Sequence, residues 1–216
     1  MMQNRLTDDL YPGFLSALLS GNREECKMIV TQLTDAGINR FVIYEAMFKR
    51  ALYDVGELWE MNRISVATEH LASSITESLL NDLYASIKVK NDKKKTVIIT
   101  SVEKELHQIG IRMISDLFEC NGWRTFFLGA NTPTTELISF AKKNKPDLIA
   151  VSLSIYMHLP VLENLLQKIK EELPGLPVLT GGQAFSHGGD EMLKKYDFVY
   201  FQPDLEHTRQ FIENIN

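Results

Sequence analysis

The sequence predicts an α/β protein in two parts, a bundle of four helices followed by an open sheet of five parallel strands with helices on both faces. Two observations predict this division. Up to residue 87, apolar residues recur every three or four positions, which is the spacing of amphipathic helices. From residue 96 onward, short β-branched runs alternate with helical stretches, which is typical of a Rossmann-like (flavodoxin-like) sheet. We therefore expect a helical cap domain at 1–90 and a Rossmann-like domain at 91–216.

Four helices are expected in the first part. Gly21 and Gly37 fall where the first two helices should stop, since glycine commonly follows the last turn of a helix. A third helix fits 39–59. A fourth fits 65–87, with Ser65 as its N-terminal cap. Helices joined by such short loops predict a small bundle.

Five strands and the helices between them are expected in the second part. The strands fit 96–102, 124–128, 148–154, 178–180 and 198–201. The helices fit 107–121, 133–144, 159–173, 189–195 and 204–215. In such sheets, ligands bind beyond the carboxyl ends of the strands. The loops of interest are therefore 102–110, 129–135, 154–159 and 181–189.

Composition limits the classes of function. The 216 residues carry 23 lysines and arginines against 28 aspartates and glutamates, which gives a net charge of −5. This mild acidity argues against a nucleic-acid interface, which requires a clustered basic face. The only dense basic run, at 88–95, is interrupted by Asn91 and Asp92 and fits a solvated joint between the two parts.

The sequence also shows none of the usual targeting or membrane-spanning signals. No apolar run approaches the roughly 18 residues of a membrane helix. Residues 1–9 are polar and lack the apolar region of a signal peptide. The two cysteines, Cys26 and Cys120, form no CxxC pair, which fits reduced thiols. The sequence therefore predicts a cytoplasmic protein with no membrane association.

The loop after the first expected strand holds the residues with the clearest chemistry. His107 stands at the ligand-binding edge of the expected sheet. Glu105, two residues earlier, can accept a proton from one ring nitrogen and so fix the tautomer that ligates a metal. Gly110 lets the backbone pass close to a bulky group. Taken alone this pattern is weak, because a loop histidine is more often a solvated side chain.

The third and fourth strands end in small residues that would line a slot beside this loop. Ser152 and Ser154 close the third strand, and Gly181-Gly182 closes the fourth. Paired glycines lack Cβ atoms, so a flat or long group can lie against their backbone. For the glycine pair alone, an ordinary turn is the favoured interpretation.

In their order along the chain, these residues resemble the cobalamin-binding signature Asp-x-His-x-x-Gly, Ser-x-Leu and Gly-Gly. The resemblance implies that His107 displaces the benzimidazole of the cofactor and ligates cobalt from below, a state called base-off and His-on. It also implies a pocket for the benzimidazole tail, lined by Gly110, Ser152, Gly181 and Gly182.

Two positions depart from that signature. Glu105 replaces the usual aspartate and keeps the carboxylate on a longer arm. Ser154 replaces the usual leucine and makes that wall of the pocket more polar. Phe185 is a candidate for contact with the ring or tail, and the loop histidines His158 and His187 are candidates at the edge of the ring.

The helical part contains a second pattern, in which Trp59 is followed by nine residues and then by Glu69-His70. The simplest interpretation packs Trp59 in the bundle core and gives His70 a structural hydrogen bond. The W-x9-E-H spacing is nevertheless similar to the cap of the cobalamin-dependent photoreceptor regulators. That resemblance implies that Trp59 covers the upper axial group of adenosylcobalamin, next to Glu69 and His70. It makes His70 a possible upper ligand once light has broken the cobalt–carbon bond.

The resemblance favours a light- or cofactor-responsive regulator that binds adenosylcobalamin, and it leaves methylcobalamin possible. The expected helices begin almost at once and leave no room for a helix-turn-helix domain. We therefore expect action through a protein partner and no direct contact with nucleic acid.

Corrinoid methyl carriers, which serve a methyltransferase, share the expected fold and form the main alternative. They usually lack the W-x9-E-H pattern. A storage or delivery module without chemistry and a relic that binds no corrin are further alternatives. An oligomer is compatible with each of them, and the sequence favours a protein that is not itself an enzyme.

Overall fold

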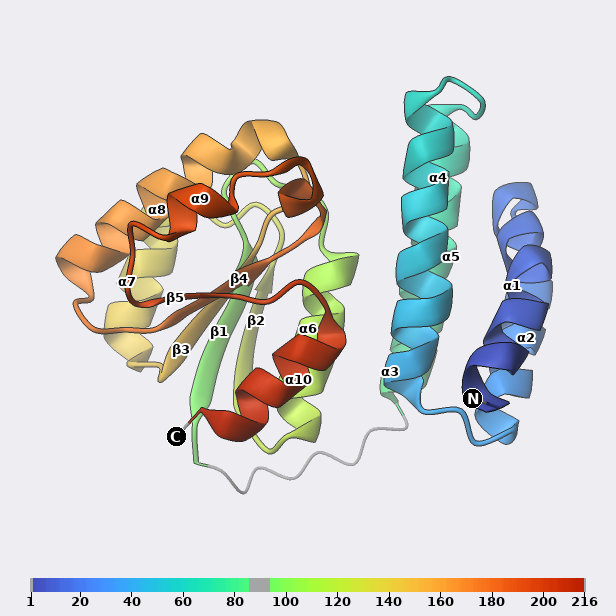
Figure 1. Cartoon of the computed structure of the whole chain (residues 1–216), viewed down its shortest axis with the longest axis horizontal. Coiled ribbons are helices and arrows are strands. Elements are labelled where there is room, and N and C mark those ends of the chain that lie inside the picture. Colours follow the sequence, from blue (N-terminus) through green and yellow to red (C-terminus); the bar gives the residue numbers. More distant parts are fainter. Residues whose placement is uncertain (1, 86–93, 216) are drawn as a thin grey trace. The chain divides into compact units, whose positions relative to one another are not determined.

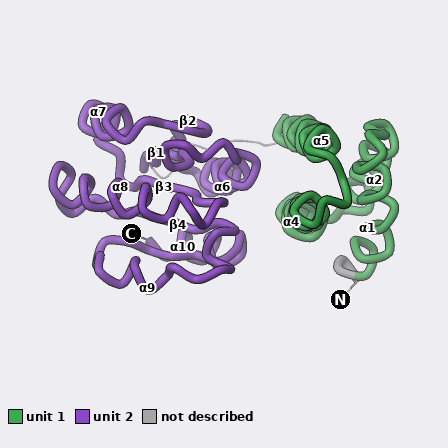
Figure 2. Tube along the Cα trace, turned by 90° about the horizontal axis from the view of Figure 1, so that it is seen from above, with its two compact units in different colours: residues 1–87 green, residues 88–216 purple. Residues whose placement is uncertain are grey.

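The computed structural model describes residues 2–85 and 94–215, and the chain divides into two compact units, Met1–Ile87 and Lys88–Asn216 (Figure 2). The first is called the helical unit and the second the sheet unit. The predicted architecture, a helical part followed by a Rossmann-like domain, is confirmed. Of the basic joint predicted at 88–95, residues 88–93 lie outside the described residues.

The helical unit is built from four rods (Figure 1). These are α1 (Met2–Ser20), α2 (Arg23–Asp35), a third rod made of α3 (Arg40–Ile43), η1 (Tyr44–Lys49) and α4 (Arg50–Glu60), and α5 (Val66–Tyr84). The predicted cap of the fourth helix is confirmed, because the backbone N–H of Thr68 donates to Ser65 Oγ at 3.2 Å.

The third rod is not the single α-helix predicted at 39–59, because η1 is a π-helix. A π-helix bonds each N–H to the carbonyl five residues back, so each hydrogen-bonded loop encloses one more residue than in an α-helix. The inward side chains of this segment still reach the core: the Phe48 ring stacks between Phe14 and Tyr44, with both centroid distances 5.9 Å. Apolar spacing alone does not distinguish the two helix types, since Tyr44, Met47 and Phe48 fit either.

The sheet unit follows the predicted alternation closely. Its elements are β1 (Thr96–Ser101), α6 (Ile109–Cys120), β2 (Arg124–Gly129), α7 (Thr134–Asn144), β3 (Leu148–Ser152), the 3-10 turn η2 (Tyr156–His158), α8 (Leu159–Glu172), β4 (Val178–Gly181), the 3-10 turn η3 (Gln183–His187), α9 (Asp190–Leu193), β5 (Val199–Phe201) and α10 (Leu205–Asn214). The strand expected at 148–154 is shorter than predicted, because the chain leaves the sheet after Ser152.

All strand pairs are parallel, in the order β2-β1-β3-β4-β5. This is the flavodoxin-like order, in which the chain first moves to one side of β1 and then to the other. The switch between β1 and β3 brings their carboxyl ends together, with Ser101 opposite Ser152 in the register. The sequence prediction places the candidate site at this edge.

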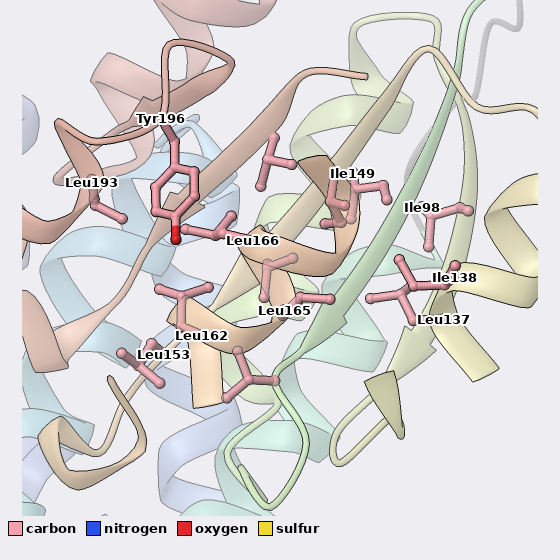
Figure 3. Close-up of a cluster of buried hydrophobic side chains, with 14 of the residues drawn as sticks. Ile98, Leu137, Ile138, Ile149, Leu153, Leu162, Leu165, Leu166, Leu193 and Tyr196 are labelled. Atoms are coloured by element: carbon pink, nitrogen blue, oxygen red, sulfur yellow. The ribbon is translucent and has the colours of Figure 1, made fainter. Parts of the chain in front are cut away.

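The core of the sheet unit explains why β-branched runs marked the strands. Ile98 and Ile149 lie on adjacent strands and are completely buried. Side chains of α7 and α8 pack over them, among them Leu137, Leu165 and Leu166 (Figure 3). Helices α6 and α10 pack together on the opposite face (Figure 1). A rigid sheet with both faces covered fixes the loops at its edge.

Within the described ranges, no helix combines the length and the apolar character needed to cross a membrane.

Candidate functional site

The loop between β1 and α6 holds a histidine on a buried carboxylate. Glu105 is completely buried, whereas the side chain of His107 is 57% exposed. Glu105 Oε1 accepts the backbone N–H of His107 at 3.1 Å and makes a short hydrogen bond to His107 Nδ1. The structure therefore pairs these two residues as the sequence predicted, and the longer arm of glutamate reaches the ring.

The protonation of the pair follows from the surroundings of Glu105. Burial opposes ionisation, but the hydrogen bonds from the His107 ring and from the backbone of Ile155 and His107 outweigh it and lower the pKa of Glu105 to about 2. Glu105 is thus an ionised acceptor near neutral pH, so Nδ1 of His107 carries the proton. In this tautomer Nε2 holds the lone pair that a metal would take.

Glu105 also connects three loops at this edge of the sheet. Its Oε2 accepts the backbone N–H groups of Ser154 at 3.0 Å and Ile155 at 2.9 Å, both in the loop after β3. Its carbonyl oxygen accepts the N–H of Asn131, after β2, at 2.9 Å. A buried carboxylate is stabilised by such donors, and here they fix the direction in which it meets His107.

His158 is a contact of Glu105 that sequence reasoning did not identify. Its Nδ1 lies 3.4 Å from Glu105 Oε2, and its side chain is only 20% exposed. The sequence placed His158 in a loop facing the site but suggested a contact with the cofactor edge. The separation of 53 positions between Glu105 and His158 provides no local signal, because only the sheet topology brings them together.

Two serines attach the histidine loop to the sheet. Ser101 Oγ donates to the carbonyl oxygen of His107 at 2.8 Å, and it lies 3.0 Å from Ser152 Oγ on β3. The predicted site residue Ser152 therefore lies at the base of the loop that holds His107. Ser154 contributes its backbone N–H, and no hydrogen bond of its hydroxyl is seen in the described contacts.

The candidate glycines differ in what surrounds them. A Cβ at Gly110 would meet open space, which leaves the first turn of α6 accessible to a large ligand. A Cβ at Gly181 would lie 2.5 Å from the carbonyl oxygen of Gln202, and one at Gly182 would lie 2.2 Å from that of Leu153. The glycine pair is therefore required by the packing of its own chain. Its part in a tail pocket remains a prediction.

Phe185 packs toward the protein. Its ring lies 5.0 Å from that of Phe201, and it contacts the hydrophobic core of the sheet unit. The expectation that Phe185 touches the cofactor is neither supported nor contradicted by this placement.

The helical unit presents its predicted residues at one end of a helical hairpin. Trp59 lies in the last turn of α4, and Glu69 and His70 lie in the first turns of α5, which runs back beside α4 (Figure 1). Trp59 is 46% exposed, so it is not the core residue of the simplest interpretation. Glu69 Oε2 lies 2.6 Å from His70 Nδ1, and Glu69 Oε1 accepts from Ser73 at 2.8 Å.

Exposed apolar side chains occur in the same loops or turns as the candidate residues of both units. In the sheet unit, Leu106 precedes His107 in its loop and Met157 lies in η2 after β3, and both are largely exposed. In the helical unit, Met61 and Val66 accompany Trp59 at the hairpin end. Apolar side chains gathered on a surface indicate a binding function more often than single exposed ones do.

These features fit a corrin. A planar macrocycle with a central cobalt requires a nitrogen donor beneath the metal, an approach without side-chain obstruction and apolar contacts for the ring. The Glu105–His107 pair, the open side of Gly110 and the exposed Leu106 and Met157 meet these requirements.

Comparison with known proteins agrees with this geometry. Residues 95–209 match the B12 binding domain, and residues 11–84 match a second type of B12 binding domain. The chain belongs to the B12-binding domain family. The first match includes His107 and its loop, and the second includes Trp59, Glu69 and His70. For this B12-binding protein, both matches indicate a cobalamin or related corrinoid as the ligand.

Two kinds of relative are found. The HTH-type transcriptional repressor CarH of Myxococcus xanthus is 27% identical over 142 residues, which are 65% of this chain and 47% of that protein. Trimethylamine corrinoid protein 1 of Methanosarcina acetivorans is 25% identical over 143 residues, which are 63% of this chain and 64% of that protein. The matched region of the B12-binding protein thus spans about half to two thirds of these relatives.

The fold matches a solved structure throughout the chain. The monomethylamine corrinoid protein of Methanosarcina barkeri superposes with a TM-score of 0.83 at 16% identity, covering 96% of this chain and 99% of that one. This similarity shows the fold that the B12-binding protein shares with it.

Proposed function

We propose that this B12-binding protein is a light- or cofactor-responsive regulator that acts through a protein partner and binds cobalamin in the base-off, His-on state. The observation that carries the proposal is the buried, ionised Glu105, which holds Nδ1 of the exposed His107. A solvated loop histidine has no need of a completely buried carboxylate. A metal-binding imidazole does, because the hydrogen bond orients the ring and raises the basicity of Nε2.

In this proposal the lower site consists of residues of the sheet unit. His107 Nε2 would ligate cobalt, and Glu105 holds the ring of His107. Gly110, Ser152, Ser154, Gly181 and Gly182 border the lower face and the tail, with Phe185 as an outer candidate.

Residues of the helical unit are the candidates for the upper site. Trp59 would cover the upper axial group of the bound cofactor, with Glu69 beside it. Glu69 holds Nδ1 of His70, as Glu105 holds that of His107, so His70 is the second candidate for a cobalt ligand. Bound adenosylcobalamin, the favoured form, would supply a cobalt–carbon bond that light can break.

The regulatory part of the proposal rests on this upper site and on the similarity to CarH. Direct contact with nucleic acid is not part of it, since the acidic composition does not favour such contact. A cytoplasmic location and an oligomeric assembly remain predictions.

Reconstitution tests the lower site. Purified protein is mixed with hydroxocobalamin and desalted, and its absorption spectrum is recorded. We expect a coloured complex whose reduced Co(II) form shows hyperfine coupling to a histidine nitrogen in electron paramagnetic resonance, assigned by labelling the protein with ¹⁵N-histidine. With His107→Ala we expect weak or base-on binding and loss of the histidine signal, while the exposed His207→Ala serves as the matched control. A histidine signal that persists in His107→Ala would contradict the assignment.

Illumination tests the upper site. The adenosylcobalamin complex is exposed to light, and its spectrum and hydrodynamic size are compared with those of a sample kept dark. We expect both to change in the parent. In Trp59→Ala we expect binding to be largely kept and discrimination between adenosyl- and methylcobalamin to weaken. A complex whose spectrum and size do not change on illumination would rule out a light sensor and leave only a cofactor-responsive regulator.

A methyl carrier for a separate methyltransferase is the second candidate, favoured by the similarity to trimethylamine corrinoid protein 1. Reduced holoprotein that accepts a methyl group through a candidate partner enzyme, with no response to light, would favour the carrier over the regulator.

A further inference from the structure

We propose that the sheet unit has a second ligand site at the amino ends of its strands, and that this site binds a small zwitterion with an apolar side chain, the chemical class of free amino acids. The His107 loop lies at the carboxyl end of β1, so the inference goes beyond the proposed function and does not rest on it. The starting observation is an open cavity with a volume of about 780 Å³. Sites for small molecules commonly have volumes of this order.

The cavity follows the amino edge of the sheet. Because all the strand pairs are parallel, the residues that precede the strands lie together at this edge. Five lining residues stand directly before the five described strands: Lys95, Trp123, Asp147, Pro177 and Phe198. Leu173 and Tyr200 add apolar surface to the wall. The cavity therefore combines apolar walls with a few polar groups, as sites for small molecules do.

Trp123 brings a buried hydrogen-bond donor to this cavity. The residue is 1% exposed, and its indole N–H has no acceptor among the residues that the structure describes. The indole nitrogen can only donate, and a buried indole N–H usually has a partner. The ring is held by an edge contact with Phe118, at a centroid distance of 5.2 Å, and by Lys95 Nζ, 5.4 Å from its centroid. A carboxylate bound in the cavity would supply the acceptor that this donor lacks.

Lys95 and Asp147 place opposite charges close together in the cavity. They precede the neighbouring strands β1 and β3, and Asp147 is bonded twice to Thr96, the residue after Lys95. Its N–H donates to the Thr96 carbonyl oxygen at 2.8 Å, and its Oδ2 accepts the Thr96 N–H at 2.7 Å. Lys95 Nζ donates to the carbonyl oxygen of Ile215 at 3.1 Å. Within the described contacts no ion pair joins Lys95 to Asp147, so Asp147 Oδ1 and two N–H groups of Lys95 are left for a ligand.

These groups match the two charges of an amino acid. Its carboxylate would accept from the Trp123 indole and from Lys95, while its ammonium group, attached to the same carbon, would donate to Asp147. Lys170 and Asp197 also line the cavity, so its charged side chains are two lysines and two aspartates. Their charges cancel, which favours a neutral zwitterion over a ligand with a single charge. The apolar side chain of the ligand would contact the apolar wall.

Nuclear magnetic resonance of the ¹⁵N-labelled chain tests the site through Trp123 itself. The chain has two tryptophans, and Trp59→Phe identifies the indole N–H signal that belongs to Trp123. On titration with L-phenylalanine or L-leucine, we expect this signal to shift until the site is saturated. A Trp123 signal that does not move would mean that water satisfies this donor, and would overturn the proposal.

Two analogues with one charge each test whether the ligand is a zwitterion. 3-Phenylpropionate lacks the ammonium group of phenylalanine, and 2-phenylethylamine lacks its carboxylate. In calorimetric titrations we expect each to bind about three- to tenfold more weakly than phenylalanine, the range that follows from losing one hydrogen bond. Equal Kd values for phenylalanine and either analogue would overturn the proposal.

Variants of the two charged residues and one control complete the test. Asp147→Asn keeps an oxygen for the Thr96 N–H and removes the charge, so it should weaken phenylalanine binding about three- to tenfold and leave 3-phenylpropionate binding unchanged. Lys95→Met should weaken the binding of both. Lys143→Ala removes an exposed lysine outside the cavity and should change neither. Circular dichroism checks each fold. Unchanged Kd values in Asp147→Asn, or an equal loss in Lys143→Ala, would contradict the proposed contacts.

Titration with hydroxocobalamin present separates this site from the proposed cobalamin site. Because the two sites lie at opposite edges of the sheet, we expect the Kd of phenylalanine to be the same with and without the corrinoid. Displacement of phenylalanine by hydroxocobalamin would place both ligands in one site and overturn the proposal. A chain that binds phenylalanine in this way but no cobalamin would refute the proposed function and support the second site.

Discussion

At the scale of single residues, Glu105 holds His107 through one carboxylate oxygen and the loop after β3 through the other. The pairing of Glu105 with His107 could be predicted, because two residues apart in a loop at a sheet edge is a local relationship. The donors on Oε2 could not, since the backbone N–H groups of Ser154 and Ile155 exist whatever their side chains are. The contact with His158 also depends on topology, because β3 must lie beside β1 before their loops meet.

Replacing Glu105 by glutamine should lower stability in a pH-dependent way. The folded chain lowers the pKa of Glu105 from its usual 4.5 to about 2, because the bonds it accepts outweigh its burial. Between these two pKa values the unfolded chain binds more protons than the folded chain. The stabilisation by the ionised Glu105 is therefore complete above pH 4.5 and is lost as the pH falls toward 2. Above pH 4.5 we expect the free energy of unfolding of Glu105→Gln to be about 1–3 kcal/mol lower than that of the parent.

Urea unfolding at several pH values checks this expectation. The difference in free energy of unfolding between parent and variant should decrease steadily as the solution is acidified. A gap that stays constant in acid would mean that Glu105 acts through its shape and not through its charge.

At the scale of elements, the strands could be located from the sequence because central parallel strands are buried on both faces. β-branched and apolar residues in runs such as Val97–Ile99 meet that requirement wherever they occur. The turns were harder to interpret. Gly182 follows β4 at a φ of 125°, and its backbone lies against Leu153, so its identity depends on a neighbour 29 residues earlier in the chain.

Gly182→Ala should damage the fold. Its Cβ would meet the carbonyl oxygen of Leu153, and its φ of 125° is one that side chains rarely adopt. Strain of this kind costs about 1–3 kcal/mol before any clash is counted. Thermal unfolding should show a clear loss of stability even without cofactor, and a variant as stable as the parent would contradict the packing described here.

Gly110→Ala should do the opposite. The added methyl group points into open space and improves the helix propensity of α6, so stability should hold or rise by up to about 1 kcal/mol. Cobalamin affinity should fall, because the methyl group occupies the approach to the His107 loop. Spectroscopic titration measures the affinity, and tight binding by Gly110→Ala would place the corrin elsewhere.

At the scale of the whole molecule, the order of motifs along the chain predicted more than any motif alone. His-x-x-Gly and Gly-Gly are each common, but their sequence on successive strands matched the family that the comparisons found. The choice between regulator and carrier could not be reached in this way. Both kinds of relative share the fold, and the distinction depends on the chemistry above the cobalt.

Binding of cobalamin should stabilise the whole folded chain. A ligand that binds only the folded state adds about 2.7 kcal/mol at a hundredfold excess over its Kd. For a protein of this size, that raises Tm by about 5–10 °C. Differential scanning calorimetry with and without hydroxocobalamin should show this shift in the parent and a smaller one in His107→Ala. Equal Tm shifts in both proteins would mean that His107 contributes nothing to the binding free energy.

The π-helix Tyr44–Lys49 has a consequence ten residues further along, at Trp59. Every position in an α-helix is turned by about 100° from the one before it. If a single residue were deleted within Tyr44–Lys49 and the rod relaxed to a regular α-helix, the inward side chains of Arg50–Glu60 could keep their places in the bundle. If instead the π-helical hydrogen bonds persisted, Trp59 would be rotated about the helix axis by roughly 100°, about a quarter-turn. The π-helix thus determines the side of the helix from which the ring of Trp59 projects.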